Sequence, residues 1–302
     1  MNEKIEINMR ERIESIGQLP TFPETATEVV KLVNNTSVSM REVSNVIGQD
    51  PSLAAKVLKF VNSAFYGLHQ SIASLQLALV MLGMKEIRNI VIGLSVFKTF
   101  DNLTHSKIFD KKQFWQHSVS VAQIARAIAQ KLSLPMEGEE FTAGLLHDIG
   151  KIAFDQYFSE EFEAAWKKSF KQNVPLYQAE KLEIGVTHAE VGAWMASKWN
   201  LPIKLVEAIE HHHEPAKAEH GKILVAVVSL ADILSRIEGV KFGGYFAETS
   251  LENSEPWQIL LKERPQLNDL DVERFTFELE TEVIKSLEFL SMVGSLGNRA
   301  EV

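Results

Sequence analysis

Cysteine is absent from the 302-residue sequence. A disulfide framework and a thiolate metal site are therefore both excluded, and any metal ion must be held by His, Asp or Glu side chains. Nitrogen and oxygen ligands of this kind suit a divalent transition metal such as Zn, Fe, Mn or Ni better than soft-ligand chemistry.

Long apolar runs and dense clusters of positive charge are also missing. The longest apolar stretch, residues 223–234, is too short to span a bilayer and contains Asp232. Residues 1–17 mix acids and bases without the apolar core of a signal peptide, so we expect a cytoplasmic protein. The net charge of −9 argues against general nucleic-acid binding, which requires a cationic face.

Alternation of apolar and polar residues, the pattern of half-buried strands, is not sustained anywhere, and helical periodicity predominates. The sequence therefore predicts an all-α fold. Ser39 and Glu42 have the spacing of a capping box, and Asp50-Pro51 combines an N-cap residue with a proline in the first helical turn. Apolar spacing from Leu53 onward predicts a helix, and residues 75–100 predict two more that separate near Gly83.

Residues 41–63 resemble two short helices joined by a turn, as in helix-turn-helix DNA-binding proteins. The second helix offers only Lys56 and Lys59 as cations, and Phe60 is expected to lie in the core. Ordinary helix packing explains this segment with fewer assumptions. A DNA-binding regulator stays a weaker alternative, and we expect no nucleic-acid partner.

Several histidine and aspartate residues interrupt apolar segments or stand at predicted helix ends. His147-Asp148 follows the apolar end of a helix, and Gly150 is expected to let the chain turn directly after the pair. Adjacent side chains on a helix diverge by about 100°, so these two converge on one ion only at such an end or bend. His117 lies on a predicted helix that has an apolar face, and Asp232 interrupts an otherwise apolar helix, where an unpaired polar group is costly.

His188 begins another predicted helix, and a histidine triplet at residues 211–213 ends the next one. Each residue alone has a simpler structural explanation. His117 would be a hydrogen-bonded core histidine, Asp232 an acceptor for Ser or Thr, and the triplet a solvated helix terminus. Their coincidence favours one shared metal site. The histidines without such a context are His69, His105 and His220.

The order of these motifs resembles the HD superfamily of metal-dependent phosphohydrolases. A histidine is followed by His-Asp-Ile-Gly-Lys at 147–151, a histidine at a helix start, His-His-Glu at 212–214 and finally an aspartate. The upstream segment is similar to the HDOD branch, whose members are output domains of bacterial signalling, through Leu19-Pro20, Asp50-Pro51, residues 61–67 and Leu82-Gly83. The resemblance covers residues 16–237.

The resemblance implies an HD-like helical domain preceded by an HDOD-type helical bundle. The expected divisions are a lead-in helix at 1–15, an N-terminal half at 16–105, a metal-site half at 106–237 and a C-terminal tail at 238–302. The tail lies outside the resemblance. Its apolar residues are spaced for a last amphipathic helix, and they are Phe275, Leu279, Val283, Leu287 and Leu290.

The resemblance also implies one or two divalent cations. One would be held by His117, His147, Asp148 and Asp232. Asp148 would bridge to a second, supported by His188, His212 and His213. As for catalysis, Asp148 would orient the attacking water and Lys151 would face a substrate phosphate. His211 is left out, because the His-His-Glu match begins at His212.

The sequence departs from the HD-GYP enzymes, which hydrolyse cyclic di-GMP. Those enzymes follow His-His-Glu with Gly-Tyr-Pro, whereas Pro215 follows Glu214 here, and Gln113 stands where they can carry a further glutamate. We therefore expect weak or no hydrolysis of cyclic di-GMP.

Two functions stay open at this point. The first is a regulatory module in which the metal is structural or vestigial, with signalling proteins as partners. The second is an active phosphohydrolase that acts on a nucleotide, a cyclic nucleotide or another small phosphorylated ligand. Access to the ions separates them, because the N-terminal half could cover the site.

Overall fold

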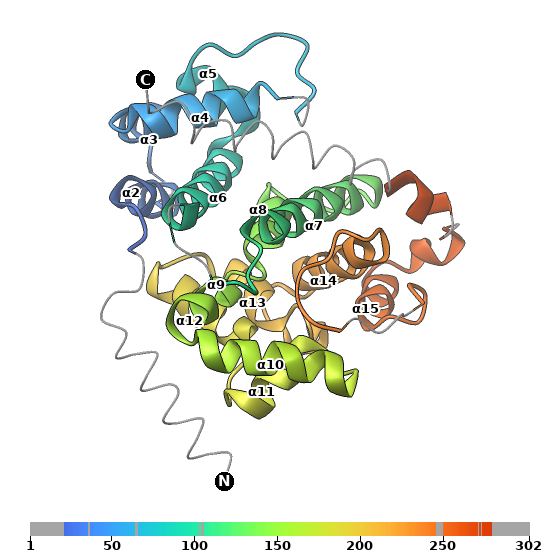
Figure 1. Ribbon diagram of the computed structural model, residues 1–302. Helices are drawn as coiled ribbons and strands as arrows, with labels where there is room; N and C mark the ends of the chain where they lie inside the picture. The colour runs from blue at the N-terminus through green and yellow to red at the C-terminus, as the bar shows by residue number, and fades with distance from the viewer. Residues whose placement is uncertain are drawn as a thin grey trace.

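A computed structural model describes residues 21–279 apart from positions 36, 64–65, 102, 104–105, 246–249, 271 and 273. Every regular element in these residues is helical (Figure 1), apart from an isolated bridge between Pro175 and Tyr245. The predicted all-α fold is confirmed. None of the described helices is both long and apolar enough to cross a membrane. The lead-in helix predicted at 1–15 lies outside the described residues.

The N-terminal half is a bundle in which α6 packs against α2, α4 and α5 (Figure 1). The predicted capping box of Ser39 and Glu42 is present, and the Asp50 side chain accepts from the backbone N–H of Leu53. Phe60 is buried, as expected. The helices are α2 (Glu24–Val33), α3 (Met40–Gly48), α4 (Pro51–Val61), α5 (Leu75–Leu82) and α6 (Met84–Asp101), with Gly83 between the last two.

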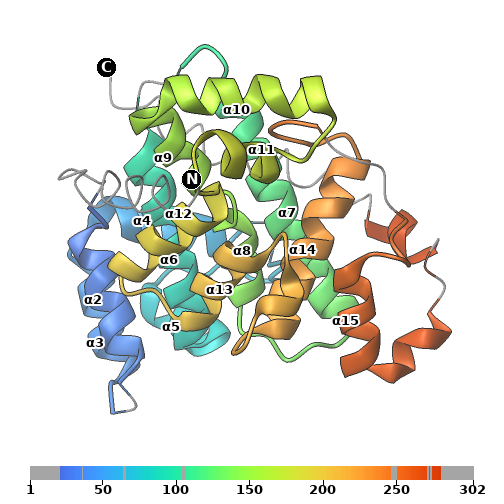
Figure 2. The same cartoon turned by 90° about the horizontal axis from the view of Figure 1, so that it is seen from below.

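In the metal-site half, α7 packs against both α8 and α14 (Figure 2). A second layer is formed by α12, which packs on α9 and α13. The elements are α7 (Lys111–Lys131), α8 (Glu139–Leu146), α9 (Gly150–Tyr157), α10 (Ser159–Gln172), α11 (Leu176–Glu183), α12 (His188–Lys198), α13 (Ile203–His211), η1 (Pro215–Lys217) and α14 (Lys222–Ile237).

The described part of the C-terminal tail packs back onto the metal-site half. It contains α15 (Glu255–Glu263), which contacts α14, and η2 (Pro265–Asp269). Phe275 and Leu279 are buried, and the Phe275 ring lies 5.9 Å from that of Trp257. The rest of the predicted final helix, with Val283, Leu287 and Leu290, lies outside the described residues.

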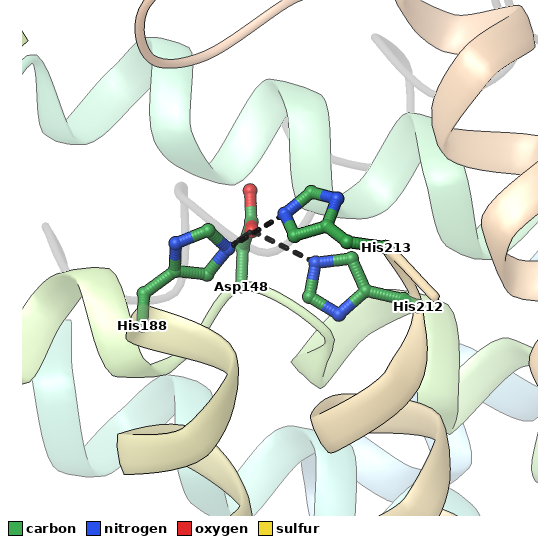
Figure 3. A group of neighbouring side chains, drawn as sticks. All are labelled: Asp148, His188, His212 and His213. Atoms are coloured by element: carbon green, nitrogen blue, oxygen red, sulfur yellow. Dashed lines mark hydrogen bonds and ion pairs between the residues drawn. The ribbon is translucent and has the colours of Figure 1, made fainter. Parts of the chain in front are cut away.

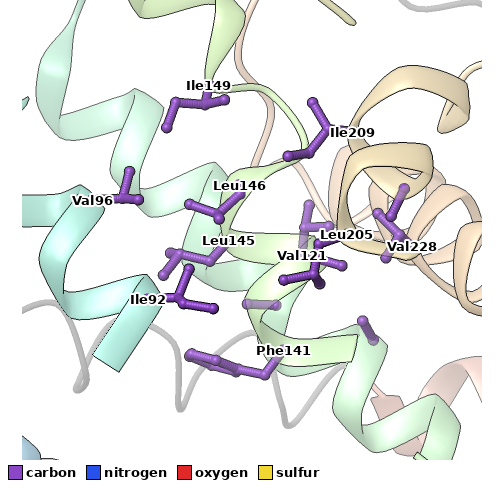
Figure 4. Packing of buried hydrophobic residues seen from close by; sticks show 14 of the residues in the cluster. Ile92, Val96, Val121, Phe141, Leu145, Leu146, Ile149, Leu205, Ile209 and Val228 are labelled. Atoms are coloured by element: carbon purple, nitrogen blue, oxygen red, sulfur yellow. The ribbon is translucent and has the colours of Figure 1, made fainter. Parts of the chain in front are cut away.

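One apolar core runs through both halves. Ile92 and Val96 of α6 lie beside Leu145 of α8, and the same cluster continues to Val121 of α7 and Val228 of α14 (Figure 4). The predicted boundary near residue 105 falls between α6 and α7, and it stays a prediction. The shared core fixes the helices that carry the site.

Candidate metal centre

Two glycines bring the helices of the site close together. A Cβ on Gly144 would lie 2.7 Å from the Cα of Ala122, so α8 reaches α7 only because this side chain is absent. A Cβ on Gly150 would lie 1.9 Å from the carbonyl oxygen of His188. Gly150 is the first residue of α9, so the expectation that it makes the turn is wrong. It instead lets the His147-Asp148 turn approach the start of α12.

Asp148 lies between two groups of imidazoles. Its Oδ1 is 3.1 Å from Nε2 of His188 and 3.6 Å from Nε2 of His212 (Figure 3). Its Oδ2 is 3.4 Å from Nε2 of His147 and 3.6 Å from Nε2 of His117. The carboxylate is completely buried, and its two oxygens face different sets of nitrogen atoms.

The remaining two predicted ligands lie at the edges of this cluster. His213 Nε2 is 3.1 Å from His188 Nε2. Asp232 Oδ1 is 3.0 Å from His117 Nε2 and also accepts from Nε of Arg236 at 2.8 Å. The fold thus brings together all seven residues named as ligands from the sequence.

Backbone carbonyls fix the orientation of three imidazoles. His117 Nδ1 lies 2.9 Å from the Val240 oxygen, His147 Nδ1 lies 2.7 Å from the Gly144 oxygen and His212 Nδ1 lies 2.8 Å from the Ile209 oxygen. A carbonyl can only accept, so each Nδ1 carries the proton. The Nε2 lone pairs therefore point into the cluster, as is usual for metal-binding histidines.

Four of the inward-facing atoms have no hydrogen-bond partner. Nε2 of His117, His147 and His212 and Oδ1 of Asp148 are all buried and unsatisfied. Buried polar atoms are nearly always hydrogen-bonded, so four orphans in one cluster call for an explanation. In addition, Asp232 Oδ1 and His117 Nε2 face each other although both atoms are acceptors. Divalent cations would bind the unpartnered atoms and separate these two acceptors, so the residues fit the implied metal.

Two overlapping groups have donor atoms that all lie within 4.8 Å of one another. The first is formed by Asp148, His188, His212 and His213, and the second by His117, His147 and Asp148. We refer to them as the four-donor position and the three-donor position. Asp232 is beside the three-donor position and shares its Oδ1 with Arg236.

The protonation states of Asp148, Asp232 and His212 suit metal ligation. Burial works to raise the pKa of Asp148, but His147 and Lys151 hold it well below its ordinary value. Burial likewise opposes ionisation of Asp232, and Arg236 and His117 more than offset it, so its pKa is lowered. Burial lowers the pKa of His212 to about 4. At neutral pH the carboxylates are therefore anionic and the His212 imidazole is neutral.

A pocket of about 350 Å³ opens beside the four-donor position. Lys151 lines it and pairs with Asp148 at 2.5 Å, and Arg236 lines it from α14. Tyr177 of α11 stacks on His213 with 4.4 Å between ring centroids. The outer wall comes from the C-terminal tail, at Tyr245 and residues 253–256. No residue of the described N-terminal half lines this pocket.

Sequence reasoning missed three contributors to the site. Arg236 stands four residues after Asp232 on the same helix, a spacing that could have indicated the pair. Glu180 and Tyr177 both lie on α11, where Glu180 hydrogen-bonds His188 and Tyr177 stacks on His213. Because these partners lie on other elements, no local sequence pattern indicated either residue.

Of the histidines that the sequence analysis left out, His211 is not in the cluster and His220 pairs with Glu207. His69 is exposed, and His105 lies outside the described residues.

Two sequence relatives match parts of this chain. An uncharacterized protein of Treponema pallidum is 25% identical over 235 residues, which are 77% of this chain and 44% of that protein. A ribonuclease Y of Thermus thermophilus is 32% identical over 120 residues, 40% of this chain but 16% of the enzyme. The chain therefore spans less than half the length of either relative.

Solved structures show a likeness in fold. An HDOD domain protein of unknown function from Geobacter sulfurreducens has a TM-score of 0.74 with 24% identity, covering 99% of both chains. A candidate phosphohydrolase from Shewanella amazonensis has a TM-score of 0.66 with 25% identity, covering 92% of this chain and 97% of that one. The family model for the HDOD domain matches residues 19–215. This chain belongs to the HDOD domain family.

Proposed function

We propose that this HDOD protein binds one or two divalent transition metal ions and hydrolyses a small phosphoester. One observation carries the proposal: buried, unsatisfied ligand atoms stand beside a pocket lined by two cationic side chains. Divalent ions bound there would supply Lewis-acid stabilisation of the phosphoryl group and activate a water as nucleophile. The donor set is compatible with Zn, Fe, Mn or Ni.

The protein side chains have distinct roles in this proposal. Asp148 links the two cation positions and orients the attacking water. Lys151 and Arg236 offset the negative charge of the phosphate, and both lie close to the carboxylates that hold them in place. Charge stabilisation of this kind is most effective in a buried site, because water screens it least there.

The pocket favours a small substrate over a polynucleotide. Its volume of about 350 Å³ lies near the lower end of the roughly 300–1,000 Å³ that small-molecule sites occupy. Residues 253–256 of the C-terminal tail and Tyr177 both line the pocket. The ribonuclease Y likeness covers only a small part of those enzymes, so it does not bring RNA to this chain. A mononucleotide or another compact phosphoester fits better.

The test combines metal analysis with a phosphoester panel on one preparation. We expect near-stoichiometric metal and turnover of small phosphoesters, with weak or no turnover of cyclic di-GMP. The double variant His147→Ala with Asp148→Ala should lose most of the metal and the activity. His211→Ala is the matched control and should keep both, because His211 lies outside the cluster.

The possible results separate the claims. Unchanged metal content in the double variant would remove the site, and robust turnover of cyclic di-GMP would refute the specificity expected here. Metal without turnover of any phosphoester would favour the regulatory module.

One observation supports that second candidate. Leu77, Val80 and Met81 form an aliphatic face on α5 in the N-terminal half, and they are 44%, 60% and 58% exposed. In a regulatory module this face would contact a signalling protein, and the metal would be structural. Replacing all three by Ser should then weaken signalling without changing metal content.

A cytoplasmic location stays a prediction.

A further inference from the structure

Glu180 lies directly behind one of the predicted ligands. Its side chain is completely buried on α11, where Oε2 accepts from Nδ1 of His188 at 2.7 Å and from the backbone N–H of His188 at 2.8 Å. Among the clustered residues, Glu180 hydrogen-bonds His188 alone.

This support differs in kind from that of the other imidazoles. His117, His147 and His212 donate to neutral backbone carbonyls, whereas His188 donates to a carboxylate. A carboxylate behind a histidine fixes the ring and makes its other nitrogen a more basic ligand. His188 should therefore be the strongest nitrogen donor of the cluster.

The two cation positions are consequently unequal. The four-donor position combines Asp148 with three imidazoles, one of which is backed by Glu180. The three-donor position has two imidazoles besides Asp148. Its nearest further oxygen, on Asp232, is already engaged by Arg236, whose charge competes with a cation for that carboxylate.

We propose that Glu180 is a positioning residue that makes the four-donor position the tighter of the two, so that the first equivalent of metal binds there. The proposal rests on the metal binding proposed above and does not depend on hydrolysis. Glu180 prepares His188 before the metal arrives, because the hydrogen bond from Nδ1 fixes the ring with Nε2 facing the cluster.

A purely structural role for Glu180 makes a different prediction. Glu180 also accepts from the first N–H of α12, so it acts as a helix cap. The same helix start already has a capping box formed by Thr187 and Glu190. If capping were the whole role, removing Glu180 would lower thermal stability and leave the order of metal binding unchanged.

The experiment is a titration of metal-free protein with Co²⁺. Binding is measured by calorimetry and by the visible absorption of the bound ion. In Glu180→Ala we expect the first equivalent to bind roughly 10–100-fold more weakly. Glu180→Gln should lose less affinity, because its amide oxygen still accepts from Nδ1 of His188. Glu140→Gln, a change at another buried glutamate, is the control and should bind like the unaltered protein.

Ligand variants identify which position is occupied first. His188→Ala should lose the tight first equivalent together with its absorption spectrum, whereas His117→Ala should retain both. Retention in His188→Ala with loss in His117→Ala would overturn the proposed order. Unchanged affinity and spectrum in Glu180→Ala would overturn the role of Glu180 while leaving the metal site intact.

Two further outcomes are also decisive. If Glu180→Ala fails to fold, Glu180→Gln carries the test, and wild-type affinity there with lowered thermal stability would identify Glu180 as a cap only. If the unaltered protein binds no Co²⁺, the metal binding under the proposed function is wrong, and the Glu180 proposal falls with it.

Discussion

The two halves of the molecule differ in the number and kind of polar side chains that they bury. Among the described residues of the N-terminal half, the buried polar or charged side chains are Arg88, Asn89 and Ser95. The metal-site half buries histidines, carboxylates and a lysine around one point. The N-terminal half is therefore stabilised mainly by apolar packing, whereas the metal-site half buries polar groups that cost stability unless they are paired or ligated.

The largest expected effect on stability lies at the contact between the halves. Phe60 of α4 is buried, and its ring lies 5.5 Å from that of Phe141 on α8. Phe60→Ala removes that packing and leaves a cavity, so we expect a loss of about 3–5 kcal/mol in the free energy of unfolding. Metal content per folded molecule should not change. Chemical denaturation and metal analysis of the same sample measure both quantities.

The matched control is Leu77→Ala on the exposed face of α5. A surface change of this kind is expected to alter stability by no more than about 0.5 kcal/mol. If Phe60→Ala also removed metal from the folded fraction, the N-terminal half would be shaping the site, and the contrast between the halves would fail.

The fold could be predicted largely because its signals are local. The capping box at Ser39 and the proline after Asp50 act within one helical turn. Gly83 separates α5 from α6 and has a positive φ of 86°. Such signals are present in any short stretch of sequence. They do not specify how the helices pack.

The ligands could be predicted for a different reason. His117 and Asp232 interrupt apolar helical faces, so the sequence marks them as exceptions. Glu180 and Tyr177 belong to a half-exposed helix where such residues are ordinary, and only the fold brings them to His188 and His213. Gly150 was identified but misread, because the clash that it avoids is with a residue 38 positions away. Tertiary contacts of this kind leave no periodic pattern.

A smaller effect on stability is expected from the pKa values of two buried carboxylates in the metal-site half, Glu140 and Asp148. Glu140 on α8 is buried, and this burial, with the nearby charge of Glu86, raises its pKa from 4.5 to about 7. Burial also opposes ionisation of Asp148, but its neighbours His147 and Lys151 lower its pKa instead. A buried carboxylate outside the cluster is therefore expected to cost stability when it ionises.

The sign of this pH dependence follows from proton binding. Between pH 4.5 and about 7 the folded protein holds the Glu140 proton and the unfolded chain releases it, so stability falls as pH rises. The full difference corresponds to roughly 3 kcal/mol. Glu140→Gln should remove this slope, leaving the variant the more stable protein at pH 8. Unfolding curves of both proteins from pH 4 to pH 8 test this, and parallel curves would show that Glu140 ionises without cost.

The smallest expected effect on stability comes from Asp50 in the N-terminal half. Its variants test whether this half only supports the fold or also influences the metal centre. Asp50 accepts from the N–H of Leu53 at 3.0 Å, and its other oxygen lies 3.4 Å from the Lys98 ammonium on α6. Asp50→Ala should cost about 1 kcal/mol through loss of the cap. Asp50→Asn keeps the cap and loses the ion pair, so it should cost less than about 0.5 kcal/mol, because exposed pairs contribute little. Neither variant should change metal content or Co²⁺ affinity. A change in affinity in Asp50→Asn would mean that a surface charge of the N-terminal half is coupled to the metal centre, and the two halves would then act as one functional unit.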